Sequence, residues 1–180
     1  MHSMQLVVIR HGETDLNKED RLQGSRGPDL ALNDTGRAQI ERLRDTLLVV
    51  PEVIYTSTAQ RTKETAAILN ERLRKDIRIS PLLCERDFGT LSGKLRSEVD
   101  PAILEADLEG HYDYRPYGGE SVEEVTARLQ KFMNTLQDAN EETVMLVTHR
   151  GVIRVLYDMY PTDASDESIV PGSKHIFRIS

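Results

Sequence analysis

The chain has one cysteine, Cys84, among its 180 residues, so it cannot form an internal disulfide. This scarcity agrees with a reducing compartment, and we expect a cytoplasmic protein. Long hydrophobic runs are missing as well. The first apolar run, Leu6 to Ile9, is too short for a signal sequence or a membrane span, and the polar residues Arg10 and His11 follow it directly. The sequence therefore predicts no membrane partner.

The chain has few positive charges. It contains 23 lysines and arginines against 30 aspartates and glutamates, which gives a net charge of −7. Such a balance argues against nucleic acid as the main partner. It also makes a local cluster of arginines more informative, since the average composition does not supply one. With 38% hydrophobic residues, the chain can bury one proper core, and we expect residues 1–180 to form a single domain.

Short apolar runs alternate with segments of helical periodicity along most of the chain. The run Val144 to Val147 is typical of a buried strand, whereas 121–137 carries apolar residues at helical spacing. Strands are expected at 5–9, 53–55, 77–79, 143–148 and 174–179, and helices at 34–50, 58–75, 96–108 (interrupted at Pro101), 121–137 and 152–160. This alternation predicts a three-layer α/β/α sandwich with a mostly parallel central sheet.

Three polar segments follow expected strands directly: 10–14, 57–61 and 148–151. Ligands of open α/β sheets bind beyond the carboxyl ends of the strands, so these segments are expected to meet at one cleft. Arg10 and Arg61 would hold phosphate oxygens with their rigid forks of donors. Of the two imidazoles, His11 and His149, one can be neutral and nucleophilic while the other is charged beside a phosphate dianion. The pattern indicates phosphoryl-transfer chemistry.

The segment Arg10-His11-Gly12-Glu13-Thr14, followed by Asn17, resembles the signature of the histidine phosphatase superfamily, which includes the cofactor-dependent phosphoglycerate mutases. Other segments resemble that family's motifs in the same order along the chain: 21–24 with 29–32, 57–66, 85–93, 118–121 and 147–149. The resemblance implies a phosphoglycerate mutase-like fold.

The resemblance also implies roles for the matching residues. His11 would attack phosphorus and become phosphohistidine, and Glu85 would be the general acid and base. The oxygens of the phosphoryl group would be held by Arg10, Asn17, Arg61 and His149. Substrate contacts are implied for Gln23 and Gly24. No metal or other cofactor is implied, because guanidinium and imidazolium groups supply the positive charge.

One residue departs from the family pattern. Arg150 stands directly after His149, where the family usually has glycine. The guanidinium of Arg150 either turns away from the pocket or reaches a second anionic group of the substrate. We expect the other cations nearby, Arg86, Lys94 and Arg96, to be solvated; the alternative is that one of them binds that second group.

The preferred function is a metal-independent phosphomonoesterase acting on a small phosphorylated metabolite, and the alternative is a cofactor-dependent phosphoglycerate mutase. The 85–94 segment resembles the mutases, whereas the length and the region 151–154 favour a phosphatase. A metal-dependent hydrolase lacks support, because the chain has no His-x-x-x-His or His-x-His pair. A non-catalytic binding module, with the site spoiled by Arg150, also stays open. The chain is expected to be a monomer or a homodimer.

Overall fold

A computed structural model describes residues 3–162 and 169–179 of the chain. Its five-stranded sheet has the order β3-β2-β4-β1-β5, and the strands are β1 Met4–Arg10, β2 Val53–Thr56, β3 Asp76–Ile79, β4 Thr143–Thr148 and β5 Lys174–Ile179. The first four strands are parallel to one another, and β5 pairs antiparallel with β1. The predicted, mostly parallel sheet is therefore confirmed, with one antiparallel edge strand.

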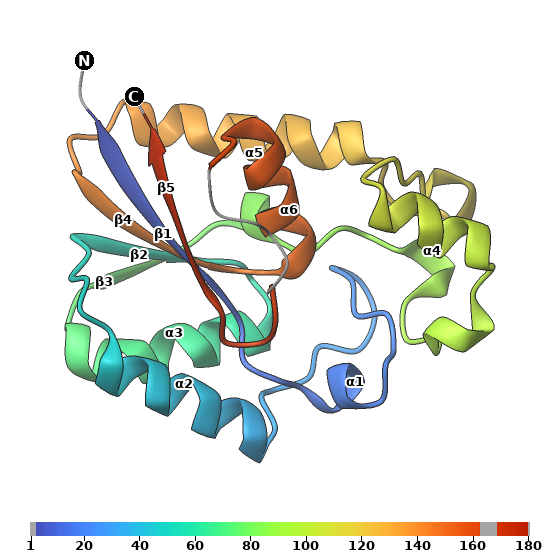
Figure 1. Ribbon diagram of the computed structural model, residues 1–180, viewed down its shortest axis with the longest axis horizontal. Coiled ribbons are helices and arrows are strands. Elements are labelled where there is room, and N and C mark those ends of the chain that lie inside the picture. Colours follow the sequence, from blue (N-terminus) through green and yellow to red (C-terminus); the bar gives the residue numbers. More distant parts are fainter. Residues whose placement is uncertain (1–2, 163–168, 180) are drawn as a thin grey trace.

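Helices cover both faces of the sheet, as Figure 1 shows. On one face lie α2 (Asp34–Thr46) and α3 (Gln60–Leu73), and on the other lie α5 (Val122–Gln137) and α6 (Arg150–Met159). The strand sequences explain this, because successive side chains of a strand point to opposite faces. Leu6 and Val8 of β1 join the core cluster under α5 and α6, whereas Val7 and Ile9 join the cluster under α2 and α3. The three-layer prediction is confirmed.

Helix boundaries follow the local capping residues. Asn33 caps α2 through a bond to the backbone N–H of Gly36, and Ser121 caps α5 in a capping box with Glu124. The expected helix at 34–50 ends earlier, at Thr46. The expected interruption at Pro101 is confirmed, since the 3₁₀ turn η3 (Arg96–Glu98) precedes α4 (Pro101–Leu108).

The helix after β4 begins two residues earlier than expected, at Arg150 instead of Val152. His149 is therefore its N-cap, and Arg150 is its first residue. The side chain of Arg150 thus leaves the helix at the end that faces the carboxyl edge of the sheet, next to His149.

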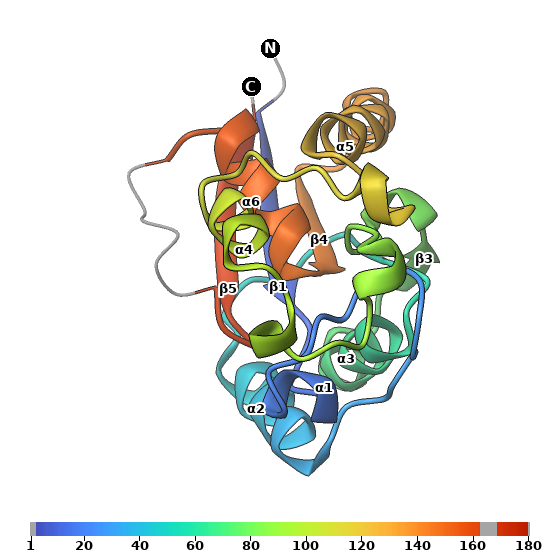
Figure 2. The same cartoon turned by 90° about the vertical axis from the view of Figure 1, so that its right-hand side faces the viewer.

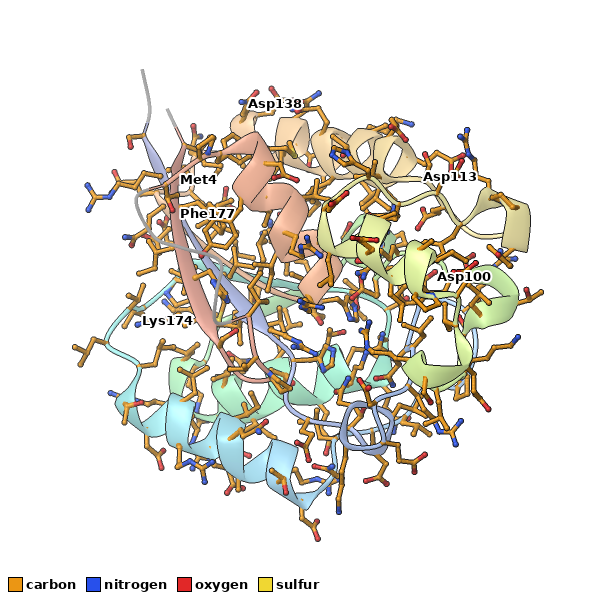
Figure 3. All side chains as sticks on the ribbon, turned by 45° about the vertical axis from the view of Figure 1, so that its right-hand side comes forward. Met4, Asp100, Asp113, Asp138, Lys174 and Phe177 are labelled. Carbon is orange, nitrogen blue, oxygen red and sulfur yellow. The ribbon has the colours of Figure 1, made fainter. Side chains whose placement is uncertain are left out.

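Short elements gather beyond the carboxyl ends of the parallel strands, at the right of Figure 1 and toward the viewer in Figure 2. They are α1 (Asp15–Lys18), α4, and the 3₁₀ turns η2 (Gly89–Leu91) and η4 (Arg115–Tyr117), whereas the turn η1 (Pro81–Leu83), which follows β3, lies nearer the middle of Figure 1. Figure 3 shows Met4 and Phe177 at one end of the molecule and Asp100 and Asp113 at the other. Within the described residues, no helix is both long and apolar enough to cross a membrane.

Candidate active site

His11 lies directly after β1, and only 4% of it is exposed. Its ring Nδ1 lies 2.7 Å from the carbonyl oxygen of Gly12. A carbonyl only accepts hydrogen bonds, so Nδ1 must carry the hydrogen and donate. In the neutral ring, Nε2 then keeps its lone pair. The hydrogen bond to the backbone thus leaves Nε2 as the nitrogen that could attack a phosphorus atom.

His149, the N-cap of α6, lies beside His11, with the ring centroids 5.2 Å apart and the planes inclined by 62°. Its Nε2 hydrogen-bonds to the Ser57 hydroxyl at 2.8 Å. Its Nδ1 is buried and has no partner among the described residues. The structure therefore brings the two predicted imidazoles together and leaves one nitrogen of His149 available to a ligand.

Both imidazoles are held in their neutral forms. Burial lowers the pKa of His11 well below 6.5, and Arg61, His149 and Arg10 lower it further because they are or become positively charged. Burial also lowers the pKa of His149 well below 6.5, followed by the charge of Arg61. Without an anion, a charged imidazole is unfavourable here. A bound phosphate dianion would favour the charged form of His149.

These pKa values predict that the folded state loses stability below about pH 6.5. In the unfolded chain the histidines take up protons near pH 6.5, whereas folded His11 and His149 bind them only at lower pH. The unfolded state therefore binds more protons in this window, and the free energy of unfolding should fall by about 1 kcal/mol per pH unit for each histidine. Urea unfolding at pH 7.5, 6.5 and 5.5 measures this.

Two substitutions provide the control for this pH dependence. His149→Gln should make the pH dependence of the unfolding free energy shallower by the contribution of His149. His111→Gln, at an exposed position, should keep the slope of the parent chain. His175, whose pKa burial also lowers, contributes in the same direction. An unfolding free energy that stays constant between pH 7.5 and 5.5 would contradict the buried, neutral state of the pair.

The two predicted arginines converge on the histidines. Arg61 lies in the first turn of α3 and is 2% exposed, with its guanidinium 3.3 Å from the Gly24 carbonyl and 3.7 Å from Asp29. Arg10, the last residue of β1, donates to the Ile169 carbonyl at 2.6 Å, and burial lowers its pKa to about 10. Such burial is costly for cations and indicates that an anion completes the site.

Buried polar atoms without a partner also gather in this region. Among the described residues, the buried side-chain nitrogens without a hydrogen bond are Arg10 Nε, Gln23 Nε2, Arg61 Nε and His149 Nδ1. Buried polar groups are normally satisfied, so each exception needs an explanation. All four belong to residues predicted from the sequence to bind phosphate or substrate. A phosphate with several acceptor oxygens would satisfy them together.

Glu85 is the buried carboxylate at this site and is 7% exposed. One carboxylate oxygen accepts from the backbone N–H of Arg86 at 2.8 Å, and the other accepts from the backbone N–H of Gly151 at 3.2 Å. Burial would raise its pKa, but the charge of Arg86 and the two backbone N–H groups outweigh burial and keep the pKa below its usual value. Glu85 is thus ionised in the free protein.

From the sequence, Glu13 and Asp87 are competing candidates for the acid/base role, but both carboxylates have other partners in the structure. Glu13 accepts a hydrogen bond from Asn33 at 2.9 Å, and Asp87 forms an ion pair with Arg26 and caps the N–H of Gly89. Of these three carboxylates, Glu85 alone lines both of the small cavities beside the histidines. The geometry favours Glu85 over Glu13 and Asp87.

Gly151 fixes the position of Glu85 by having no side chain. A Cβ added at Gly151 would lie 2.3 Å from a Glu85 carboxylate oxygen and 2.1 Å from a guanidinium nitrogen of Arg86. We expect Gly151→Ala to displace the carboxylate and to lower kcat about 100-fold, the lower end of a general acid/base contribution. In a Glu85→Ala background, Gly151→Ala should lower kcat little further, because both substitutions act through the Glu85 carboxylate. Fully additive losses would contradict this explanation.

The expectation that Arg86 is solvated is wrong. Arg86 is 2% exposed, and its guanidinium lies between Glu85 and Asp107, with the shortest bond to Asp107 at 2.7 Å. Tyr114 also donates to Asp107, and the Phe88 ring lies 4.7 Å from the Arg86 guanidinium carbon. Arg86 is therefore a buried residue that positions Glu85, and sequence reasoning missed this role.

The remaining predicted residues border the same region. Asn17 accepts from the backbone N–H of Thr14 at 3.1 Å, and Gln23 accepts from the Thr14 hydroxyl at 2.8 Å. A cavity of about 40 Å³ is lined by His11, Arg10, Asn17, Gln23 and Arg150, among others. A second cavity, of about 70 Å³, is lined by Arg61, His149 and Gly24, and Glu85 lines both. Each is large enough for a few water-sized atoms.

Arg150 faces the site and not the opposite side of the molecule, because it lines the same cavity as His11 and Arg10. The option that its guanidinium turns away is therefore not what the structure shows. As for a metal site, within the described residues no three His, Cys, Asp or Glu side chains are grouped so that they could hold a metal ion.

Comparison with known proteins agrees with this fold. The crystal structure of a phosphoglycerate mutase from Thermus thermophilus superposes with a TM-score of 0.79 at 34% sequence identity, covering 96% of this chain and 92% of that chain. Residues 6–165 match the family model of the histidine phosphatase superfamily (branch 1). The fold is thus phosphoglycerate mutase-like, and the chain belongs to the histidine phosphatase superfamily, branch 1.

Relatives in this family carry names of both activities. Phosphoglycerate mutase-like protein 4 of Arabidopsis thaliana is 33% identical over 97% of this chain and 79% of its own length. Glucosyl-3-phosphoglycerate phosphatase of Mycobacterium tuberculosis is 32% identical over 87% of this chain and 74% of its own length. Several of the distant relatives are phosphatases of small phosphorylated metabolites.

Proposed function

We propose that the chain is a metal-independent phosphomonoesterase that hydrolyses a small phosphorylated metabolite through a phosphohistidine on His11. The observation that carries the proposal is the 2.7 Å hydrogen bond from Nδ1 of the buried His11 to the Gly12 carbonyl, beside buried arginine donors without partners. This bond implies that Nε2 keeps its lone pair. Nucleophile, cationic donors and a carboxylate are the parts that phosphoryl transfer requires.

In the first step, Nε2 of His11 forms a bond to phosphorus while the bond from phosphorus to the ester oxygen breaks. Arg10, Arg61 and His149 stabilise the charge that spreads over the equatorial oxygens. Asn17, Gln23 and Gly24 border the phosphate and the remainder of the substrate. The leaving oxygen takes a proton from Glu85.

Glu85 must hold a proton to act as an acid, although its pKa is low in the free protein. A phosphate dianion nearby raises the pKa of a carboxyl group, so substrate binding supplies the required shift. In the second step, ionised Glu85 takes a proton from water, the water oxygen bonds to phosphorus, and the bond to Nε2 breaks. Inorganic phosphate leaves and His11 is restored.

A phosphate-release screen over phosphorylated metabolites, with and without a chelator, tests this function. We expect release from at least one phosphomonoester and the same rate after exhaustive chelation. Loss of all activity on chelation would favour a metal-dependent hydrolase. Binding of inorganic phosphate without turnover of any substrate would favour a non-catalytic module.

The second candidate is a phosphoglycerate mutase, favoured by the similarity to the Thermus thermophilus enzyme of that name. The two functions share the first step and differ in whether water or a second hydroxyl accepts the phosphoryl group. Incubation with 3-phosphoglycerate and its bisphosphorylated primer separates them. Interconversion of the phosphoglycerates without free phosphate would replace the phosphatase proposal by the mutase.

The proposal also covers the domain organisation, the oligomeric state and the cellular compartment of the enzyme. We expect a single domain, present as a monomer or a homodimer, that acts in the cytoplasm, where Cys84 stays a free thiol. Sedimentation velocity of the purified chain determines its oligomeric state.

A further inference from the structure

A large basin adjoins the small cavity that contains His11. The basin has a volume of about 420 Å³ and is lined by four arginines, Arg10, Arg21, Arg96 and Arg150. The small cavity is lined by the same four arginines and, in addition, by His11 and Glu85. The two spaces therefore share one wall of cations, and a molecule whose phosphate lies at His11 would extend into the basin.

Arg150 differs from the other arginines of this wall. Arg21 is paired with Glu19, and Arg96 is paired with Asp20 at 3.1 Å. The guanidinium of Arg150 makes no hydrogen bond or ion pair with any residue that the structure describes. Burial lowers its pKa, and the neighbouring cations Arg154, Arg86 and Arg96 lower it further. A partly buried, unpaired cation among like charges is unfavourable unless an anion visits it.

The two carboxylates that line the basin, Glu13 and Asp20, offset this charge only in part. Asp20 is paired with Arg96, whereas Glu13 accepts a hydrogen bond from the neutral amide of Asn33 and forms no ion pair with an arginine of the wall within the described residues. The protein as a whole carries a net charge of −7, so a cationic wall is a local arrangement and not a consequence of composition. The remaining positive charge belongs to Arg150 and to Arg10, and Arg10 also borders His11.

We propose that Arg150, with Arg10 and Arg96, forms a subsite for a second anionic group of the substrate, and that the substrate class is a phosphomonoester bearing a carboxylate or a second phosphate. This inference rests on the proposed function, since it takes the phosphate next to His11 as the reacting one. The second group would lie in the basin and receive charge-assisted hydrogen bonds from the guanidinium of Arg150.

Matched ligands isolate the contribution of the second anion. The pair 3-phosphoglycerate and glycerol 3-phosphate differs in a carboxylate, and the pair fructose 1,6-bisphosphate and fructose 6-phosphate differs in a second phosphate. Binding is measured by calorimetry on the His11→Ala variant, which does not depend on turnover. We expect the more highly charged member of at least one pair to bind about tenfold more tightly or better. The pair that shows the preference identifies the second group.

Substitution of Arg150 tests its part in the preference. In the background of His11→Ala, Arg150→Gln should reduce the ratio of the two affinities to nearly one. Arg42→Gln, at an exposed position on α2, should keep the ratio of the parent. Equal binding of both members in both pairs, or a ratio that survives Arg150→Gln, would overturn the proposal.

These experiments distinguish failure of the subsite proposal from failure of the phosphatase proposal. If the affinity ratio is present and depends on Arg150, but the wild-type chain releases no phosphate, then the subsite stands and the phosphatase proposal fails. If the wild-type chain hydrolyses phosphomonoesters and the ratios are near one, then the function stands and the subsite fails.

Discussion

His11→Ala should lower kcat/KM for phosphate release by about 10⁴-fold or more, because it removes the nucleophile of a reaction that proceeds through a covalent intermediate. The expectation rests on the fixed ring of His11, whose Nδ1 donates to the Gly12 carbonyl at 2.7 Å and leaves Nε2 with its lone pair. No other described histidine except His149 lies in contact with this ring. Steady-state phosphate release by the variant and the wild-type chain measures the effect.

The control for His11→Ala is His111→Ala, which removes an exposed histidine and should keep full activity. The His11 variant should remain folded, because alanine there leaves the β1 and β4 pairing untouched. Its far-ultraviolet circular dichroism and urea midpoint check this. A folded His11→Ala protein with activity within tenfold of the wild type would show that another group attacks phosphorus.

Arg61→Ala should lower kcat/KM by about 10²- to 10³-fold, the loss expected when one charged donor to a developing oxyanion is removed. Arg61 is 2% exposed and has a buried, unpartnered Nε, so its guanidinium is prepared for a ligand that the protein itself does not supply. Asp29 lies 3.7 Å away and is half exposed, which makes it a weak competitor. Arg61→Lys should recover only part of the loss, since lysine keeps the charge but lacks the planar fork.

Arg72→Ala is the matched control for Arg61. Arg72 belongs to the same helix, α3, but is exposed and donates to the backbone carbonyls of Arg44 and Asp45. We expect its activity to equal that of the wild type. If Arg61→Ala, shown to be folded by its urea midpoint, loses less than threefold in kcat/KM, then Arg61 does not contact the transferred phosphoryl group.

The convergence of the site was accessible from the sequence, because it depends only on parallel strands. Arg10 ends β1, and His11 and His149 directly follow β1 and β4. These two strands pair in parallel register from Gln5 with Thr143 to Arg10 with Thr148. Apolar runs reveal such strands, and their polar carboxyl ends then mark the site. Residues adjacent to strand ends are therefore predictable without knowing any tertiary contact.

Arg86 was not predictable in this way, since its partners come from tertiary packing. Asp107, in α4, accepts from Arg86, and Tyr114 donates to Asp107, but these residues meet through loops whose path no periodic pattern reveals. Arginines in loops are exposed more often than buried, so the residue type favoured the incorrect prediction that Arg86 is solvated. Gly151 was a partial signal, because a glycine, which has no Cβ, permits the close approach of another group.

The position of Arg150 depended on a helix boundary, the least certain feature of a sequence pattern. Apolar periodicity begins at Val152, whereas the helix itself begins at Arg150. This difference places the side chain of Arg150 beside the N-cap His149, where it lines the cavity of His11. The direction of the Arg150 side chain therefore followed only from the structure.

The central claim is that Nε2 of His11 forms a covalent bond to phosphorus. The most direct test is rapid quench of the wild-type chain with a substrate labelled with ³²P in its phosphoryl group, followed by peptide mapping. We predict an acid-labile, alkali-stable adduct on the peptide that contains His11, formed no more slowly than phosphate is released. An active enzyme that gives no such adduct, or that carries the label on another residue, would contradict the claim.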